Sequence, residues 1–335
     1  MEAAMTPPSR RRIEFVLDNL VWFMLLFVLT VFSIFIPNYF QPAIFANIIE
    51  ASSVLGVMSI GLALVILAGQ MDLSVESVAA LAAMSVGILF CSAGIGLDLS
   101  LTPAWLAVPV SIFAALAVGG LIGLMNGFLI VKAKMNAFII TLAAYIWVRG
   151  LVVAISGGRS AQDLDPAIRW FGIQRLLGIP LTAWIAILCF VAFSFMMAKT
   201  PFGRHLKMIG GNETATHRAG IRVARNLMIA FVLAGATAGL AGWLLTIRTS
   251  GATANLGIGM LFNAFAAVVI GGISLKGGVG SLPGVYAGVL LLSSINTAIN
   301  LMGLPAHVTQ VIHGLLVLAA VMLDTFKQTI RRGLA

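Results

Sequence analysis

Charged residues are scarce in this chain. Only 9% of its 335 residues are Asp, Glu, Lys or Arg, whereas 60% are hydrophobic. Soluble globular domains carry roughly a quarter charged residues, so this composition excludes an ordinary water-soluble protein. We expect the chain to have lipid rather than water as its main surroundings.

Cysteine and histidine are also rare. The sequence holds two cysteines, Cys91 and Cys189, and four histidines. Thiols so few and so dispersed exclude a disulfide framework and argue against a metal site. No HExxH-type helix, nucleophile elbow or paired-acid cleft is visible. We therefore expect no catalytic residues, no metal site and no enzyme activity.

A phosphate-binding loop is missing as well. The run GGISLKGGVGSLPG at 271–284 is glycine-rich, but Lys276 is followed by Gly277, where that loop needs Ser or Thr. The chain is therefore expected to bind no nucleotide cofactor itself. Because glycine permits positive φ and close backbone approach, the run predicts a tight cytoplasmic turn between two short helices.

Long uncharged runs are what the sequence has in abundance. A membrane-spanning helix needs about 20 mainly apolar residues. Runs without Asp, Glu, Lys or Arg cover residues 19–49, 51–71, 77–97, 99–131, 176–198, 226–247, 249–275 and 277–323. The helices that these runs predict cover residues 16–36, 44–69, 73–92, 104–131, 136–156, 181–198, 226–248, 260–273, 281–301 and 306–323. The predicted fold is an all-α polytopic membrane protein of about ten transmembrane helices, forming a single domain over 1–335.

The basic residues predict the orientation. With the N-terminus inside, 15 of the 20 Lys and Arg residues fall in cytoplasmic segments, as the positive-inside rule requires. The remaining five fall outside or at an outer helix end: Arg149, Arg159, Arg169, Arg175 and Arg248. Both termini are therefore predicted to be cytoplasmic. The net charge of +9 reflects this topology, and no nucleic-acid partner is expected because no basic patch is interleaved with aromatics.

Two of the segments that connect the predicted helices are long. The loop 157–180 is expected on the outer side, and the loop 199–225 on the inner side.

The hexapeptide GQMDLS that starts at Gly69 is similar to GGISLK at Gly271. With five helices per half, two such copies would have opposite orientation, a recurring transporter design. The sequence thus suggests two inverted five-helix halves.

Two carboxylates, Asp72 and Glu76, lie four residues apart in GQMDLSVES and so share one helix face. Acidic residues in membrane segments are costly and often functional. A structural role is the other interpretation, with Asp72 as the N-cap and Glu76 interacting with the helix dipole. Both interpretations stay open, and we include both residues among the candidates for the translocation path or gate.

Amide side chains add further path candidates. Asn126, Asn136, Asn263 and Asn296 lie in or beside apolar runs, where each needs a hydrogen-bond partner or a wet cavity. They could bind a polyhydroxylated solute, or they could link helices to one another.

The inner loop predicts one short helix outside the membrane. In GRHLKMIGGNETATHRAGI, Asn212 can cap a helix over 213–219 and Gly220 can end it. Its residues are small and polar, with Ala215 and Ala219 on one face. Such a helix could seat in a groove of a partner protein, or it could be a solvated connection.

Three segments together resemble a known family. They are MDLSV at the start of the third helix, the inner-loop sequence GRHLKMIGGNETATHRAGI, and FNAFAAVVIGGISLKGGVGSLPG after it. In order and spacing they are similar to the ribose-type permease family of ABC importers, over nearly the whole chain. The family's third-helix motif commonly has Gly where this chain has Gln70 and Glu76, a departure that puts the solute in doubt.

The resemblance implies function and partners. The chain would be the permease subunit of an importer for a sugar-like solute in the bacterial inner membrane. Its partners would be a second permease subunit, two cytoplasmic ABC ATPase domains that use ATP and Mg, and a periplasmic solute-binding protein. Carried over by position, the ATPase-coupling segment would consist of Gly210, Gly211, Asn212, Glu213, Thr214, Ala215, Thr216, His217, Arg218, Ala219 and Gly220.

Several alternatives stay open at this point. An ion-coupled secondary transporter or facilitator would use Asp72 and Glu76 as its coupling carboxylates. The solute could be a pentose, a hexose, a polyol, a nucleoside or a related molecule. The second permease subunit could be an identical or a related chain.

Overall fold

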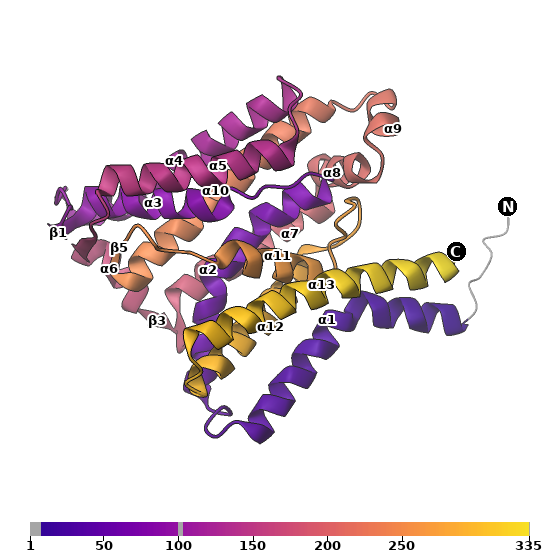
Figure 1. Ribbon diagram of the computed structural model, residues 1–335, viewed down its shortest axis with the longest axis horizontal. Coiled ribbons are helices and arrows are strands. Elements are labelled where there is room, and N and C mark those ends of the chain that lie inside the picture. Colours follow the sequence, from indigo (N-terminus) through magenta and orange to yellow (C-terminus); the bar gives the residue numbers. More distant parts are fainter. Residues whose placement is uncertain (1–7, 100–102, 335) are drawn as a thin grey trace.

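The computed structural model describes residues 8–99 and 103–334, and most of them are helical (Figure 1). In chain order the elements are α1 (Pro8–Phe35), α2 (Pro42–Leu67), α3 (Val75–Phe90), β1 (Cys91–Gly94), the 3-10 helix η1 (Ala104–Leu106), α4 (Ala107–Val131), α5 (Ala137–Ser156), β2 (Ala161–Leu164), α6 (Pro166–Ile173), β3 (Arg175–Leu176), β4 (Ile179–Pro180), α7 (Leu181–Lys199), α8 (Pro201–Gly211), α9 (Glu213–Arg218), α10 (Val223–Thr249), β5 (Gly251–Ala252), α11 (Met260–Ile270), α12 (Leu282–Leu301) and α13 (Ala306–Leu334).

The helices follow the apolar runs closely. In the described part of the chain, six helical segments are long and apolar enough to cross a membrane: Pro42–Leu67, Ala104–Val131, Ala137–Ser156, Leu181–Lys199, Val223–Thr249 and Leu282–Leu301. Shorter apolar helical segments are Asn19–Phe35, Val75–Phe90, Met260–Ile270 and His307–Leu323. The prediction of a mainly helical, multi-pass membrane protein is confirmed.

Two helices form the centre of the molecule. α10 packs against α2, α3 and α4, and α2 packs in addition against α7, α11 and α12. Nearly every residue of α2 from Ser52 to Leu67 is buried, and Trp243 of α10 is fully buried. A helix that is apolar on all sides belongs inside such a bundle.

Glycines allow α4 and α10 to approach closely. A Cβ on Gly119 of α4 would lie 2.1 Å from the carbonyl oxygen of Gly235 in α10, and one on Gly239 would lie 2.1 Å from the oxygen of Ala115. Small residues are typical where membrane helices pack backbone to backbone. This crossing fixes α4 on the side of the central helix α10.

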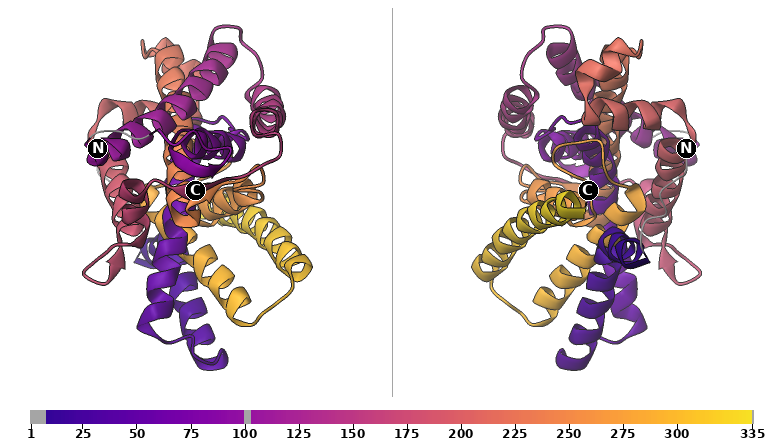
Figure 2. Two further views of the ribbon diagram at one scale, coloured as in Figure 1. Left: turned by 90° about the vertical axis from the view of Figure 1, so that its left-hand side faces the viewer. Right: turned by 90° about the vertical axis from the view of Figure 1, so that its right-hand side faces the viewer.

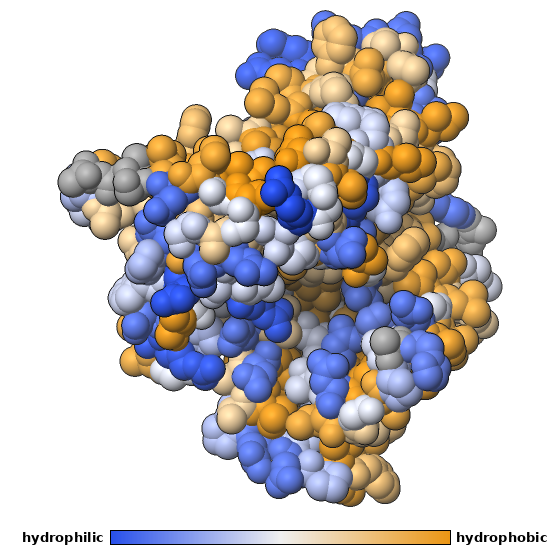
Figure 3. Space-filling view, turned by 60° about the vertical axis from the view of Figure 1, so that its left-hand side comes forward, coloured by the Kyte–Doolittle hydropathy of each residue, from blue (hydrophilic) through white to orange (hydrophobic). Residues whose placement is uncertain are grey.

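The peripheral helices carry apolar side chains on their outer faces. Exposed examples on α4, α5 and α7 are Phe113, Leu121, Ile146, Leu188 and Phe195. An apolar surface of this extent needs lipid or a partner protein to cover it. Figure 3 shows apolar flanks around a face on which hydrophilic residues gather.

Short strands mark one end of the molecule, which we call the strand end. β2 pairs antiparallel with both β1 and β5, with Cys91 opposite Leu164 and Ala161 opposite Ala252. β3 and β4 form a separate small hairpin. The predicted outer loop 157–180 thus contains β2, α6 and this hairpin, although the apolar pattern predicts none of them.

The opposite end carries α8 and α9, and we call it the α9 end. The beginning of α1 and the end of α13 point toward this same end (Figure 1). α13 packs on α11 and diverges from α12 at their connecting turn (Figure 2). The predicted inside cations Arg10, Arg11, Arg12, Lys327, Arg331 and Arg332 lie outside the described side chains.

The sequence similarity between 69–74 and 271–276 does not mark inverted copies. Copies in opposite orientation would lie at opposite ends of the bundle. Instead, a Cβ on Gly277 would lie 2.8 Å from the Cα of Gly69, so both segments meet at the α9 end. The aligned glycines also differ in conformation, since Gly69 has φ +75 and Gly271 has φ −62. The structure therefore does not support these two segments as inverted copies.

Candidate functional site

The predicted short helix of the inner loop is present. α9 runs over Glu213–Arg218, and the Asn212 side chain caps it by accepting a hydrogen bond from the Ala215 N–H at 2.9 Å. Gly220 has φ +80 and donates to the His217 carbonyl at 3.0 Å, which ends the helix. Both the capping residue and the terminating glycine are confirmed, because both act through local hydrogen bonds.

α9 projects at one end of the molecule (Figure 1) and contacts α8 and α10. Ala215 and Ala219 are exposed, and in the segment from Gly211 to Gly220 only Thr216 is buried. The Thr216 hydroxyl donates to the Asn212 carbonyl at 2.7 Å and tightens the first turn. The result is a small, capped projection with alanine, threonine and charged side chains available to a partner.

Gly210, the first residue of the predicted coupling segment, lies elsewhere. It is half-buried, and a Cβ there would lie 2.0 Å from the Leu67 carbonyl oxygen. This residue therefore faces the body of the protein rather than a partner.

A hollow with basic residues lies beside α9, at the junction of α4, α9 and α10. Its volume is about 630 Å³. The lining residues are Val131, Lys132, His217, Gly220, Ile221, Arg222, Val223, Ala224, Arg225, Met228 and Ile229. The α9 projection therefore has cationic side chains at its base.

Asp72 makes its hydrogen bonds within the turn before α3. Its Oδ1 accepts from the Ser74 N–H at 2.9 Å and from the Ser74 hydroxyl at 2.6 Å. The Ser74 hydroxyl in turn accepts from the Asn126 amide of α4 at 3.0 Å. All three side chains are buried. The N-cap position belongs to Ser74, whose side chain makes no capping bond. The prediction of Asp72 as N-cap was therefore wrong by two residues, although its carboxylate accepts a backbone N–H before α3 as predicted.

Glu76 is the hub of a second buried network. Its Oε1 pairs with Nη2 of Arg149 at 3.0 Å, and its Oε2 accepts from the Leu261 N–H, at the start of α11, at 2.9 Å. Arg149 Nη1 donates to the carbonyls of Ala254 and Leu256, each at 3.1 Å. Glu76 is buried and Arg149 is half-buried, and the cost of removing these charges from water is offset because each has a charged partner and further hydrogen bonds.

This network ties α3 and α5 to the connection between α10 and α11. Arg149 lies inside α5, seven residues before its last residue, Ser156. The prediction of Arg149 at an outer helix end was therefore wrong. The sequence signal that could have revealed the pair is a glutamate inside the predicted helix 73–92 and an arginine inside the predicted helix 136–156, because a charge within a membrane helix needs a partner.

The remaining amides do not join these networks. Asn136 is exposed and caps α5 by accepting from the Ile139 N–H at 3.2 Å. Asn296 Oδ1 lies 2.5 Å from His313 Nε2 and links α12 to α13. Asn263 is half-buried on α11. Of the six path candidates, the structure therefore connects Asp72 with Asn126, and it places Asn136 and Asn296 in structural contacts.

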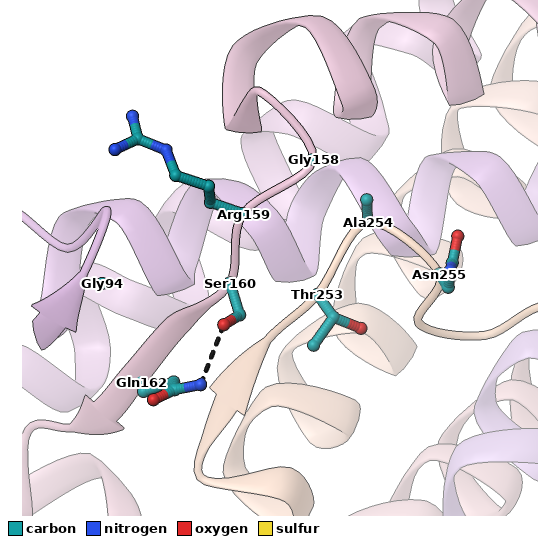
Figure 4. A pocket seen from close by; sticks show the side chains of 8 residues that line it. All are labelled: Gly94, Gly158, Arg159, Ser160, Gln162, Thr253, Ala254 and Asn255. Atoms are coloured by element: carbon teal, nitrogen blue, oxygen red, sulfur yellow. Dashed lines mark hydrogen bonds between the residues drawn. The ribbon is translucent and has the colours of Figure 1, made fainter.

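A polar hollow opens at the strand end (Figure 4). Its volume is about 550 Å³. The lining residues are Gly94, Gly158, Arg159, Ser160, Gln162, Thr253, Ala254 and Asn255. Gln162 donates to the Ser160 hydroxyl at 2.9 Å. One wall, from Thr253 to Asn255, adjoins the carbonyls that Arg149 holds. Sequence reasoning missed these residues because they come together only through the strand pairing.

Comparison with known proteins decides the family. A family described as the permease component of branched-chain amino acid transport systems matches residues 44–321. The chain belongs to this family of membrane permeases. The match covers most of the chain, from α2 into α13. No metal cluster is found among the described residues, and a permease of this family is a transport subunit rather than an enzyme.

Similar curated proteins are sugar permeases. The permease is 35% identical to the ribose import permease protein RbsC of Escherichia coli (strain K12), over 91% of this chain and 92% of that protein. It is 37% identical to the L-arabinose transport system permease protein AraH of the same strain, over 93% and 91%. It is 35% identical to RbsC of Bacillus subtilis (strain 168), over 98% and 99%. No solved structure matches the chain.

Proposed function

We propose that this chain is the membrane-spanning permease subunit of an ATP-driven ABC importer that carries a sugar or sugar-like solute across the bacterial inner membrane. The observation that carries the proposal is α9, a capped and exposed helix on a lipid-embedded body. Support for the solute class comes from the ribose and L-arabinose permeases to which the chain is similar.

In this proposal, α9 and the residues around it form the contact with an ABC ATPase. Residues 212–220 would seat in a groove of the ATPase, which supplies ATP and Mg, and this chain would bind no cofactor. ATP binding would draw the two ATPase domains together and displace α9. The exposed Ala215 and Ala219 are small enough to permit close approach of a partner backbone.

We further propose that ten helices cross the membrane in two inverted five-helix halves. Support comes from two pairs of helices rather than from the glycine-rich segments. α2 ends beside Gly210 at the α9 end, and α10 ends at β5 in the strand end. These two central helices therefore run in opposite directions. Each is followed by a shorter apolar helix, α3 or α11, as an inverted repeat requires.

Orientation and partners complete the proposal. The α9 end would be cytoplasmic together with both termini, and the strand end would face the periplasm. The polar hollow around Ser160 and Asn255 would lie where a periplasmic binding protein releases its solute. A second permease subunit, identical or related, would complete the path, since transport between two such subunits needs a shared interface.

An ion-coupled transporter is the competing function, and the carboxylates argue against it. Coupling would require a carboxylate free to exchange its ion. Both Glu76 oxygens are already engaged, one by Arg149 and the other by the Leu261 N–H. Asp72 Oδ1 is engaged by Ser74. The observed contacts favour a structural role for the pair.

Reconstitution tests the proposed function. The permease is inserted in lipid vesicles with or without its ATPase and solute-loaded binding protein, and uptake of radiolabelled pentoses and hexoses is measured. We expect uptake only with ATPase, ATP and binding protein together. Accumulation driven by an ion gradient in vesicles that hold the permease alone would overturn the proposal.

A further inference from the structure

Three backbone segments meet at four glycines at the α9 end. Gly69 follows α2, Gly210 lies near the end of α8, and Gly277 and Gly278 lie in the turn between α11 and α12. We call these four residues the glycine joint. The Gly278 N–H donates to the Leu67 carbonyl at 2.9 Å, so a hydrogen bond fastens the turn to the end of α2.

At Gly210, Gly277 and Gly278 the joint has no room for a side chain. A Cβ on Gly210 would lie 2.0 Å from the Leu67 carbonyl oxygen and 2.5 Å from the Gly278 nitrogen. A Cβ on Gly277 would lie 2.8 Å from the Cα of Gly69 and 2.9 Å from the Cα of Gly210. The atoms that would be struck belong to the backbone, so no side-chain rotation can relieve the clash.

The glycine joint lies between the α8–α9 segment and the membrane helices. Gly210 comes two residues before Asn212, the residue that caps α9. Along the chain, α8 and α9 are attached to the membrane helices only through α7 and α10. The joint adds a third attachment, through space, to the end of the central helix α2 and to the 271–281 turn that connects α11 with α12.

We propose that the glycine joint transmits the displacement of α8 and α9 to α2 and to the 271–281 turn, so that these segments move as one body during transport. Gly210 is then a positioning residue for transport rather than a contact of the ATPase. Backbone packed directly on backbone has no flexible side chain to absorb a displacement. This inference rests on the proposed coupling role of α9.

Two adjacent glycines provide a matched test. Gly211 directly follows Gly210 and is the last residue of α8, but a Cβ there would have nothing within 4 Å. Gly210 has no positive φ, so Gly210→Ala introduces a clash without backbone strain. Gly211→Ala adds the same methyl group one residue later, without the clash.

The variants are assayed in vesicles that hold the complete importer. With Gly210→Ala we expect sugar uptake to fall about tenfold or more, equivalent to about 1.4 kcal/mol in the rate. The ATPase should still co-purify, and its hydrolysis should no longer respond to loaded binding protein. Gly211→Ala should retain uptake within about twofold. Native uptake by Gly210→Ala would overturn the proposal.

A distance measurement tests whether the segments of the glycine joint move as one body, even if Gly210→Ala fails to assemble. Cys91 and Cys189 are first replaced by alanine, and spin labels are then attached to cysteines introduced in pairs; the glycines of the joint are left unchanged. One pair joins the exposed residues Arg204 of α8 and Lys276 of the turn, and a second pair joins Arg204 to Leu177 in the strand-end hairpin. If the joint moves as one body, ATP changes the second distance and leaves the first unchanged. A first distance that changes as much as the second would overturn the proposal.

Failure of the joint and failure of the proposed function are separable. Ala215→Glu tests the ATPase contact on α9 alone. If Ala215→Glu abolishes uptake while Gly210→Ala transports normally, the coupling role of α9 stands and only the joint is wrong. If Ala215→Glu transports normally, the coupling role itself is wrong.

Discussion

The buried Glu76 carboxylate of α3 and the half-buried Arg149 guanidinium of α5 form an ion pair with 3.0 Å between Oε1 and Nη2. Only 1% of the Glu76 side chain is exposed and 17% of that of Arg149. The pair orders the connection between α10 and α11, because Arg149 holds the carbonyls of Ala254 and Leu256 and Glu76 holds the Leu261 N–H.

Removal of one partner from this pair is expected to destabilise the permease strongly. Arg149→Ala leaves the Glu76 charge buried and unpaired, which typically costs about 3–5 kcal/mol. The melting temperature of the detergent-solubilised permease should fall markedly. Arg169→Ala, at an exposed arginine of the strand end, serves as control and should cost within about 0.5 kcal/mol. Equal melting temperatures for the two variants would contradict the assigned role of the pair.

The exposed face of α9 is expected to tolerate no bulky charge in the assembled importer. Ala215→Glu should abolish uptake and prevent co-purification of the ATPase, because the added carboxylate cannot enter a close interface. Membrane insertion should be unaffected, since Ala215 is exposed. Ala133→Glu, at an exposed residue of the connection between α4 and α5, provides a matched charge outside α9 and should transport normally.

Loss of the α9 cap should loosen that helix without disturbing the rest of the molecule. Asn212→Ala removes the acceptor for the Ala215 N–H, and loss of an N-cap costs about 1 kcal/mol. Amide hydrogen exchange over Glu213–Arg218 should become several-fold faster, and uptake should decline. Asn212→Asp keeps a side-chain acceptor and should restore both. Unchanged exchange in the alanine variant would show that the cap does not hold the helix.

Two adjacent glycines of α4 should respond differently to substitution by alanine, because only one of them lies against α10. A Cβ on Gly119 would lie 2.1 Å from the Gly235 carbonyl oxygen, whereas one on Gly120 meets nothing within 4 Å. We expect Gly119→Ala to lower the melting temperature, because overpacking of this kind costs about 1–3 kcal/mol. Gly120→Ala should be neutral or slightly stabilising, since alanine favours helix over glycine. A reversed order would contradict the close approach of the two backbones at this crossing.

Thiol labelling tests both burial and orientation at the strand end. Burial, with a contribution from Asp163, raises the pKa of the Cys91 thiol to about 11. The reactive thiolate is therefore scarce at pH 7, and labelling by a membrane-impermeant maleimide should be slow and should accelerate as the pH rises. Ser92→Cys, at the exposed neighbouring residue, should label rapidly from the periplasmic side of intact cells. Labelling of Ser92→Cys only after the inner membrane is opened would reverse the proposed orientation.

Much of the helical framework could be predicted from the sequence. Each predicted segment contains a helix, and the segment 136–156 begins at the residue that caps α5, Asn136. The short helix after Asn212 agrees with its prediction to within one residue. Cap residues can be recognised because they bond to backbone only three positions away, and apolar runs can be recognised because lipid excludes charge.

The partners of the buried polar residues could not be predicted. Glu76 lies 73 residues from Arg149 and 185 residues from Leu261 in the chain. The spacing of Asp72 and Glu76 predicted one shared helix face, yet their hydrogen bonds go to different elements, Ser74 in the first case and α5 and α11 in the second. Local spacing specifies a helix face, but it does not specify what packs against that face.

The sequence by itself determined that this chain belongs in lipid, which apolar segments form helices, and that a short capped helix lies between two of them, although it did not determine where α1 begins or where α13 ends. These properties follow from residues within one or two turns of each other and from the cost of placing charge in a membrane. Only the tertiary structure decided which carboxylate meets which arginine, which loops line the polar hollow, and that Gly69, Gly210 and Gly277 meet. Those contacts join segments distant in the chain, and the shapes of packed helices, not local preference, bring them together.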